Sequence, residues 1–272
     1  MENIRSFIEE KKKDISDACL NYPIIRDDIF SLFDEDKCIV IYYPLVDRDN
    51  NGFNVSYRYN GKTIDFVYIN TAQYKEKQIF TAAHELGHIW KVESWIKEKT
   101  HKEIDYELGE RIVNRFAAEL LMPENEFSSC TAREMKQVKT FGDLIQAVTA
   151  LMNEFFTSYK SVVYRLYELR MISGKTGTVL FGKTERLPMN KIEEVSIRTA
   201  QEKGYSRLYQ KDDYYYIDGL KDLLDEAKEK EAFSESWIDT FYEKFGLKST
   251  KQDGALEEPL PDEENGGGDP DD

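Results

Sequence analysis

The segment 84–88, with the sequence His-Glu-Leu-Gly-His, constrains this chain more than any other part of it. It lies within a stretch, from about residue 75 to 95, whose apolar residues recur at the spacing of an α-helix. Side chains four positions apart on a helix project from one face, so the imidazoles of His84 and His88 can reach a single metal ion. The chain must therefore fold so that this helix is exposed on one side to a metal and to a further ligand.

Two histidines and a glutamate in this spacing are typical of zinc peptidases. In such enzymes the metal lowers the pKa of a water molecule and polarises the scissile carbonyl. Glu85, beside the first histidine, is placed to hold that water and to take its proton. The competing interpretation is a pair of histidines on an amphipathic helix without a metal. A third protein ligand distinguishes the two interpretations, because a catalytic zinc keeps three protein ligands and one open position.

The third ligand must come from another part of the chain. Ser94 stands where a metzincin has its third histidine, so that class of enzyme is excluded. The alternative is a glutamate on the following helix, predicted over 104–122, as in thermolysin-like enzymes. Glu110 is the first candidate on this helix, and Glu107, one turn earlier, is the second. Asn114 follows Glu110 on the same face and is placed to fix the orientation of a ligand histidine.

Other side chains near these helices are weaker candidates. Glu103, Glu119 and His101 compete with Glu110 for the place of third ligand. An oxyanion-stabilising group is also expected near the metal. Tyr74, His101 and Tyr106 are candidates for it by proximity in sequence alone, and the choice among them stays open.

Composition and charge exclude several classes of protein. The 272 residues hold 37 Lys and Arg against 52 Asp and Glu, and the net charge of -15 argues against direct nucleic-acid binding. No apolar run is long enough to span a membrane, and the N-terminal residues lack the apolar core of a secretory signal. The 3 cysteines are far apart, which fits free thiols in the cytoplasm better than disulfides.

The pattern before the motif changes from helical to β. After predicted helices over 3–20 and 24–33, three runs have the composition or alternation of β-strands: 38–46, 53–59 and 63–70. Asn-Gly pairs separate these runs, and Asn-Gly is a strong hairpin signal. We therefore predict a three-stranded antiparallel meander over 38–70. Its last strand, 64–70, is the predicted edge to which an extended substrate adds as a further strand.

The chain beyond the motif reads as mostly helical. Pro123 ends the helix over 104–122, because proline lacks an N–H group and restricts the residue before it. Further helices are predicted over 142–153, 158–171, 189–203, 218–231 and 234–245. The last segment, 252–272, is acidic and rich in Pro and Gly, so it is predicted to be a disordered tail.

The predicted fold class is α+β. A zincin-like metallopeptidase domain over 1–174, with a β-meander, an active-site helix and a glutamate-bearing helix, precedes a mostly helical accessory region over 175–251 and the tail over 252–272. The helix pair over 142–171 is interpreted as a hairpin packed on the catalytic domain rather than as a DNA reader. The tyrosine-rich stretch 205–216 is interpreted as part of the accessory region rather than as a recognition surface.

Two segments carry a resemblance to a known family. They are 78–88, Gln-Ile-Phe-Thr-Ala-Ala-His-Glu-Leu-Gly-His, and 110–123, Glu-Arg-Ile-Val-Asn-Arg-Phe-Ala-Ala-Glu-Leu-Leu-Met-Pro. They resemble the paired motifs of the ImmA/IrrE metallo-endopeptidases, an Ala-His-Glu-hydrophobic-Gly-His helix and a Glu-x-x-Ala-Asn-x-Phe-Ala-x-x-Leu-Leu-Met-Pro helix. Val113 replaces the usual alanine and is the one departure. The likeness covers roughly residues 35–172, about half the chain, and 142–172 resemble the helix-turn-helix-like part of that family.

The resemblance implies a zinc ion, with manganese as an alternative in vivo, held by His84, His88 and Glu110, with Glu85 as general base. It also implies a cytoplasmic endopeptidase that cleaves a helix-turn-helix transcriptional repressor of the XRE type and so derepresses stress or mobile-element genes. A second hypothesis is a metal-stabilised regulator that binds a repressor or DNA without cutting. Glu85 favours the enzyme, because a structural zinc needs no adjacent base.

Overall fold

The computed structural model describes residues 2–14, 20, 22–35, 38–45, 50–59, 61–185, 187–211 and 214–247. The chain forms two compact units, Met1–Asp218 and Gly219–Asp272. Within the described ranges, no helix has both the length and the apolar character needed to cross a bilayer. The predicted acidic tail over 252–272 lies outside the described residues, and the predicted domain boundaries at 174 and 251 stay predictions.

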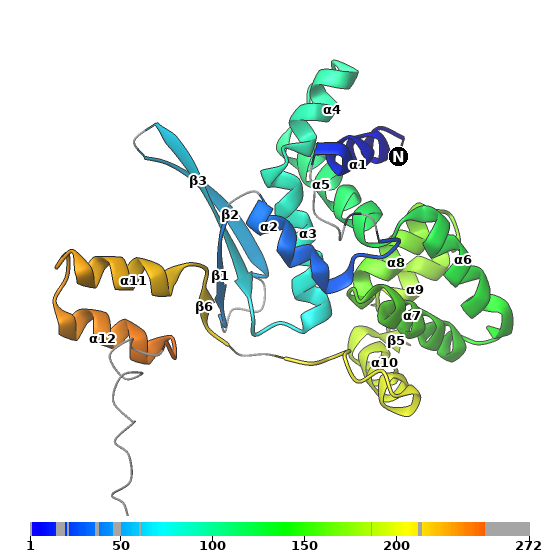
Figure 1. Cartoon of the computed structure of the whole chain (residues 1–272). Coiled ribbons are helices and arrows are strands. Elements are labelled where there is room, and N and C mark those ends of the chain that lie inside the picture. Colours follow the sequence, from blue (N-terminus) through cyan, green and yellow to red (C-terminus); the bar gives the residue numbers. More distant parts are fainter. Residues whose placement is uncertain are drawn as a thin grey trace, which may run out of the picture. The chain divides into compact units, whose positions relative to one another are not determined.

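A mixed four-stranded sheet forms the β part of the first unit (Figure 1). Its strands are β1 (Ile39–Tyr43), β2 (Gly52–Tyr59), β3 (Lys62–Asn70) and β6 (Tyr216–Ile217). Their order is β2-β3-β1-β6, with β2 antiparallel to β3, β1 parallel to β3 and β6 antiparallel to β1. The predicted α+β class and the hairpin between β2 and β3 are therefore confirmed.

The predicted antiparallel meander is wrong at its first strand, because β1 pairs with β3 in parallel and not with β2. Gly52 does not have the positive φ that an Asn-Gly hairpin turn requires. The connection from β1 instead leads to the far side of β3. The side chain of Asn70 holds it, accepting from the amide of Leu45 at 3.0 Å and donating to the carbonyl of Asn50 at 2.7 Å.

Because the chain passes from β1 to the far side of β3, the border strand of the sheet is not the one predicted. Because β3 has neighbours on both sides, the prediction that 64–70 is a free edge is wrong. The outer strand of the described sheet on that side is β2. It packs against helix α3 (Lys75–Ile89), and Gly52 permits the approach, since Thr81 and the carbonyl of Tyr68 leave no room there for a β-carbon.

Helix α3 carries the motif and crosses helix α5 (Tyr106–Leu121) at close range. Gly87 lies at the crossing, where an added β-carbon would stand 2.8 Å from Phe116 and 2.9 Å from Val113. A larger residue at position 87 would therefore push the two helices apart. The glycine of the motif thus brings the face of α5 that bears Glu110 toward the two histidines.

The single helix predicted over 75–95 is wrong, because the chain breaks after α3 and resumes as α4 (Val92–Thr100). Lys91 lies between the two helices in the left-handed region, with φ 57° and ψ 44°. The buried side chains of Trp90 and Val92 flank it on both sides. Apolar periodicity alone does not show such a break, because the residues that flank it are themselves buried.

The first unit also contains helices and two short strands besides those already described. They are α1 (Glu2–Asp14), η2 (Arg26–Phe30), α2 (Ser31–Glu35), α6 (Glu124–Glu134), η3 (Met135–Gln137), α7 (Phe141–Phe155), α8 (Tyr159–Glu168), α9 (Gly174–Leu180) and α10 (Met189–Lys203), with the short strands β4 (Lys183–Thr184) and β5 (Leu187–Pro188). The sequence did not predict α6 or α9. Pro123, which ends α5, is also the N-cap of α6, and Ser173 caps α9 by accepting from the amide of Thr176.

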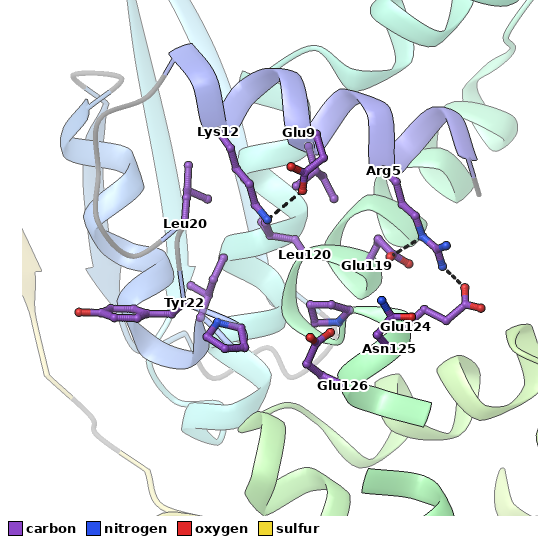
Figure 2. Close-up of a pocket in the computed structure, with 14 residues that line it drawn as sticks. Arg5, Glu9, Lys12, Leu20, Tyr22, Glu119, Leu120, Glu124, Asn125 and Glu126 are labelled. Carbon is purple, nitrogen blue, oxygen red and sulfur yellow. Dashed lines mark hydrogen bonds and ion pairs between the residues drawn. The ribbon is translucent and has the colours of Figure 1, made fainter. Parts of the chain in front are cut away.

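Helix α1 is attached to the rest of the first unit through charged side chains around an open pocket (Figure 2). Arg5 donates from Nε to Glu119 of α5 at 2.8 Å and pairs through Nη2 with Glu124 of α6. Figure 2 shows Arg5 reaching from α1 to both carboxylates. One guanidinium thus connects the end of the Glu110-bearing helix with the helix that follows it.

The second unit contains the helices α11 (Leu220–Glu229) and α12 (Glu235–Lys244), close to the predicted bounds. Leu224, Ile238 and Tyr242 form a small core of their own between these helices. The hydroxyl of Tyr242 donates to the carboxylate of Asp225, which ties the two helices together.

Candidate active site

Three metal-ligand side chains converge where α3 crosses α5. The Nε2 atoms of His84 and His88 lie 3.3 Å apart. The Nε2 of His84 lies 3.4 Å from Oε2 of Glu110, and the Nε2 of His88 lies 3.4 Å from Oε1 of the same carboxylate. Among the described residues these three are the group whose ligand atoms all lie within 4.8 Å of one another.

Hydrogen bonds at the other ring nitrogens assign the tautomers of both histidines. The Nδ1–H of His84 donates to Oδ1 of Asn114 over 3.2 Å, and Asn114 is itself held by donating to the carbonyl of Glu110 at 2.8 Å. The Nδ1–H of His88 donates to a carboxylate oxygen of Glu93 over 2.8 Å. Both Nε2 atoms therefore present lone pairs to the centre, as metal-binding histidines do.

The electrostatics of the two histidines differ. Burial lowers the pKa of His84, which favours its neutral form. The hydrogen bond with Glu93 raises the pKa of His88 and outweighs the opposite effect of burial. The Nδ1–H of His84 donates to a neutral amide and that of His88 to a carboxylate. The Nε2 atoms of the two histidines therefore differ in basicity.

This donor set fits a divalent metal ion. Ligand atoms in a tetrahedral site with bonds of about 2.0–2.1 Å are separated by roughly 3.3–3.4 Å. The two histidine nitrogens have this spacing, and a different oxygen of Glu110 lies 3.4 Å from each of them. Without a cation, two imidazole lone pairs and a carboxylate would face one another at short range and repel. Two histidine nitrogens and one carboxylate match the ligands that zinc takes in hydrolytic sites, and manganese also accepts imidazole and carboxylate.

Glu85 lies beside this centre and is buried in the protein. Its Oε2 accepts a hydrogen bond of 2.8 Å from the side-chain amide of Asn54 in β2. An open pocket of about 510 Å³, lined by Gly52 and Thr81 among others, reaches both Glu85 and His84. The carboxylate can therefore meet a water molecule from the pocket while β2 fixes its orientation.

One acceptor oxygen that lines the pocket has no hydrogen-bond donor among the described residues. Asn51 lines it, and the side-chain oxygen of Asn51 is buried without a hydrogen-bond partner among the described residues. A buried acceptor without a partner is unfavourable, and a donor from a bound molecule would satisfy it.

The other residues that the sequence suggested as third ligand or as oxyanion-stabilising group make contacts elsewhere or are exposed. Glu103 pairs with Lys97 at 2.9 Å, while Glu119 is engaged by two arginines from α1 and α8. His101 is the left-handed C-cap of α4, and Tyr106 is 82% exposed. Glu107 is also exposed, at the start of α5. Tyr74 caps the opposite end of α3 and packs edge-on against a tyrosine of the segment after α10.

Two side chains of this site were missed by the sequence analysis, Glu93 and Asn54. A continuous helix through 95 would turn Glu93 away from His88, so its role depends on the break at Lys91. Asn54 reaches Glu85 only because β2 lies against α3. The alternation of β2 indicated which of its residues share a face, but it did not indicate which helix that face meets.

The comparison with known families agrees with this geometry. Residues 37–167 match the family model described as Peptidase_M78, IrrE N-terminal-like domain. The matched range contains both crossing helices and the side chains that converge between them. No curated protein matches the chain. The resemblance is confirmed over residues 37–167, just under half of the chain, which carry an IrrE N-terminal-like domain of the Peptidase_M78 family, a family of peptidases.

Proposed function

We propose that this chain is a metal-dependent endopeptidase in which His84, His88 and Glu110 hold one zinc ion, or manganese in its place. The observation that supports this most strongly is the convergence of three acceptor groups at 3.3–3.4 Å, a separation that a cation explains. The base beside this centre favours an enzyme over a purely structural metal site, because a structural zinc needs no neighbouring base.

The roles of the side chains follow from their positions. A bound zinc would supply a Lewis acid that makes water more acidic and polarises a carbonyl group. Glu85 accepts the proton of the attacking water at its carboxylate and then delivers it to the nitrogen of the departing amine. Asn54 keeps that carboxylate directed at the pocket, while Asn114 keeps the ring of His84 in place.

The proposed substrate is a protein segment in extended conformation, in a transcriptional repressor of the XRE type. An extended peptide can add to the outer strand β2, whose residues approach Glu85. The unpaired oxygen of Asn51 in the same pocket suits an N–H group of a main chain. Cleavage of a repressor in the cytoplasm would derepress the stress or mobile-element genes that it controls.

The test is to incubate the protein with a purified XRE-type repressor, with zinc or manganese and with a chelator. We expect a discrete pair of fragments with metal and an intact repressor with chelator, as measured by electrophoresis and mass spectrometry. A repressor that binds but stays intact with either metal would contradict the endopeptidase. That result would support the alternative, a metal-stabilised regulator that acts without cutting.

A further inference from the structure

The break between α3 and α4 determines where Glu93 points. In a continuous helix, the five steps from His88 to Glu93 would turn the side chain about 140° away from the histidine. The left-handed conformation of Lys91 instead starts a new helix in a different direction. Trp90 is 5% exposed and Val92 is fully buried, so the core fixes the chain on both sides of the break.

Glu93 is then held from two sides. Its Oε1 lies 2.8 Å from Nδ1 of His88. Its stem lies against the backbone of α5, where an added β-carbon on Gly109 would stand 3.7 Å from Cγ of Glu93. Gly109 directly precedes Glu110, so one carboxylate side chain contacts a metal-ligand histidine and packs against the residue before the third ligand.

Helix α4, which carries Glu93, is itself anchored to α1. The ring of Trp95 meets Phe7 edge-on, with centroids 5.4 Å apart, and its Nε1 donates to Glu10 at 3.2 Å. These contacts restrict movement of α4 along α5. Glu93 is therefore held in place by contacts of its own helix as well as by His88.

We propose that Glu93 is a positioning residue of the metal centre, which sets the affinity of the site for a divalent ion through His88. By accepting the Nδ1–H with a full negative charge, it fixes Nε2 as the ligand atom and makes it more basic. Asn114 does the first of these for His84 but, as a neutral amide, not the second. This inference rests on the proposed metal centre.

The experiment measures the dissociation constant for Zn²⁺ by competition with a chromogenic chelator. Glu93→Gln keeps the shape of the side chain and removes its charge, while Glu93→Leu also removes the acceptor. We expect Glu93→Gln to bind Zn²⁺ about 10- to 100-fold more weakly than the wild type, and Glu93→Leu to bind at least as weakly. The absorption spectrum of bound Co²⁺ should change most in Glu93→Leu, because in that variant no acceptor holds the ring of His88.

Glu98→Gln is the matched control, since Glu98 is an exposed glutamate on the same helix. It should bind Zn²⁺ within about twofold of the wild type. A residue that only stabilised the fold would lower the melting temperature of the metal-free protein and leave the dissociation constant unchanged. Glu93→Gln binding Zn²⁺ like Glu98→Gln would overturn the proposal. Absence of binding in the wild type would instead overturn the metal centre itself, and this role with it.

Discussion

Glu85→Gln is expected to keep the fold and the metal of the protein and to lose about 10²–10⁴-fold in the rate of repressor cleavage. Glutamine has the same shape, and its side-chain oxygen can still accept from Asn54, which in the wild type donates to Glu85 at 2.8 Å. It has no basic oxygen to take a proton from water. The measurement is the initial rate of fragment formation, at equal metal content of the two proteins.

Glu107→Gln controls for the loss of one negative charge near the centre, because Glu107 is exposed on α5. We expect its cleavage rate to stay close to that of the wild type. If Glu85→Gln cleaved as fast as Glu107→Gln, Glu85 would not be the base. Loss of metal from Glu85→Gln would mean that the carboxylate of Glu85 is a metal ligand rather than the general base.

Arg165→Met is expected to lower the free energy of unfolding by about 3–5 kcal/mol, because it leaves a buried carboxylate without its main partner. Arg165 is 1% exposed in α8. Its guanidinium pairs with Glu119, donates to Glu168 at 2.8 Å and donates to the carbonyl of Met122 at 3.1 Å. After the substitution, Arg5 is the remaining ion-pair partner of Glu119 among the residues that the structure describes. The measurement is urea unfolding with chelator present, so that bound metal does not add to the stability.

Arg170→Met removes an exposed arginine just after the same helix and should change stability by less than about 0.5 kcal/mol. The double substitution Glu119→Gln with Arg165→Met should recover part of the loss, because it no longer leaves a buried charge unpaired. If Arg165→Met were as stable as Arg170→Met, the buried pair would not stabilise the fold. Helix α8 holds two basic side chains, Lys160 and Arg165, and the burial of Arg165 withdraws one of them from any contact with DNA.

The residues that converge between α3 and α5 were predictable because both helices are strongly patterned. A four-residue spacing places His84 and His88 on one face, and the crossing at Gly87 leaves Glu110 as the carboxylate that meets them. These features depend on local sequence and on one close helix contact. Periodicity records the local spacing, but it does not by itself choose Glu110 over Glu107, one turn earlier on the same helix.

The features that were not predicted depend on where chain segments meet in three dimensions. The parallel pairing of β1 with β3 rests on a connection held by Asn70, and an Asn-Gly pair looks the same whether or not it forms a hairpin. The approach of Glu93 to His88 rests on one left-handed residue, Lys91, whose side chain gives no sign of that conformation. Helix α6 was missed because Pro123, which ends one helix, also begins the next.

The central claim is that His84, His88 and Glu110 hold a divalent metal, and metal content tests it most directly. The wild type, Glu110→Ala and Glu107→Ala are purified alike, loaded with Zn²⁺, dialysed, and analysed by mass spectrometry for bound zinc. We expect about one zinc per chain in the wild type and in Glu107→Ala, and little in Glu110→Ala, which leaves only two protein ligands. Full zinc content in Glu110→Ala, or none in the wild type, would contradict the claim.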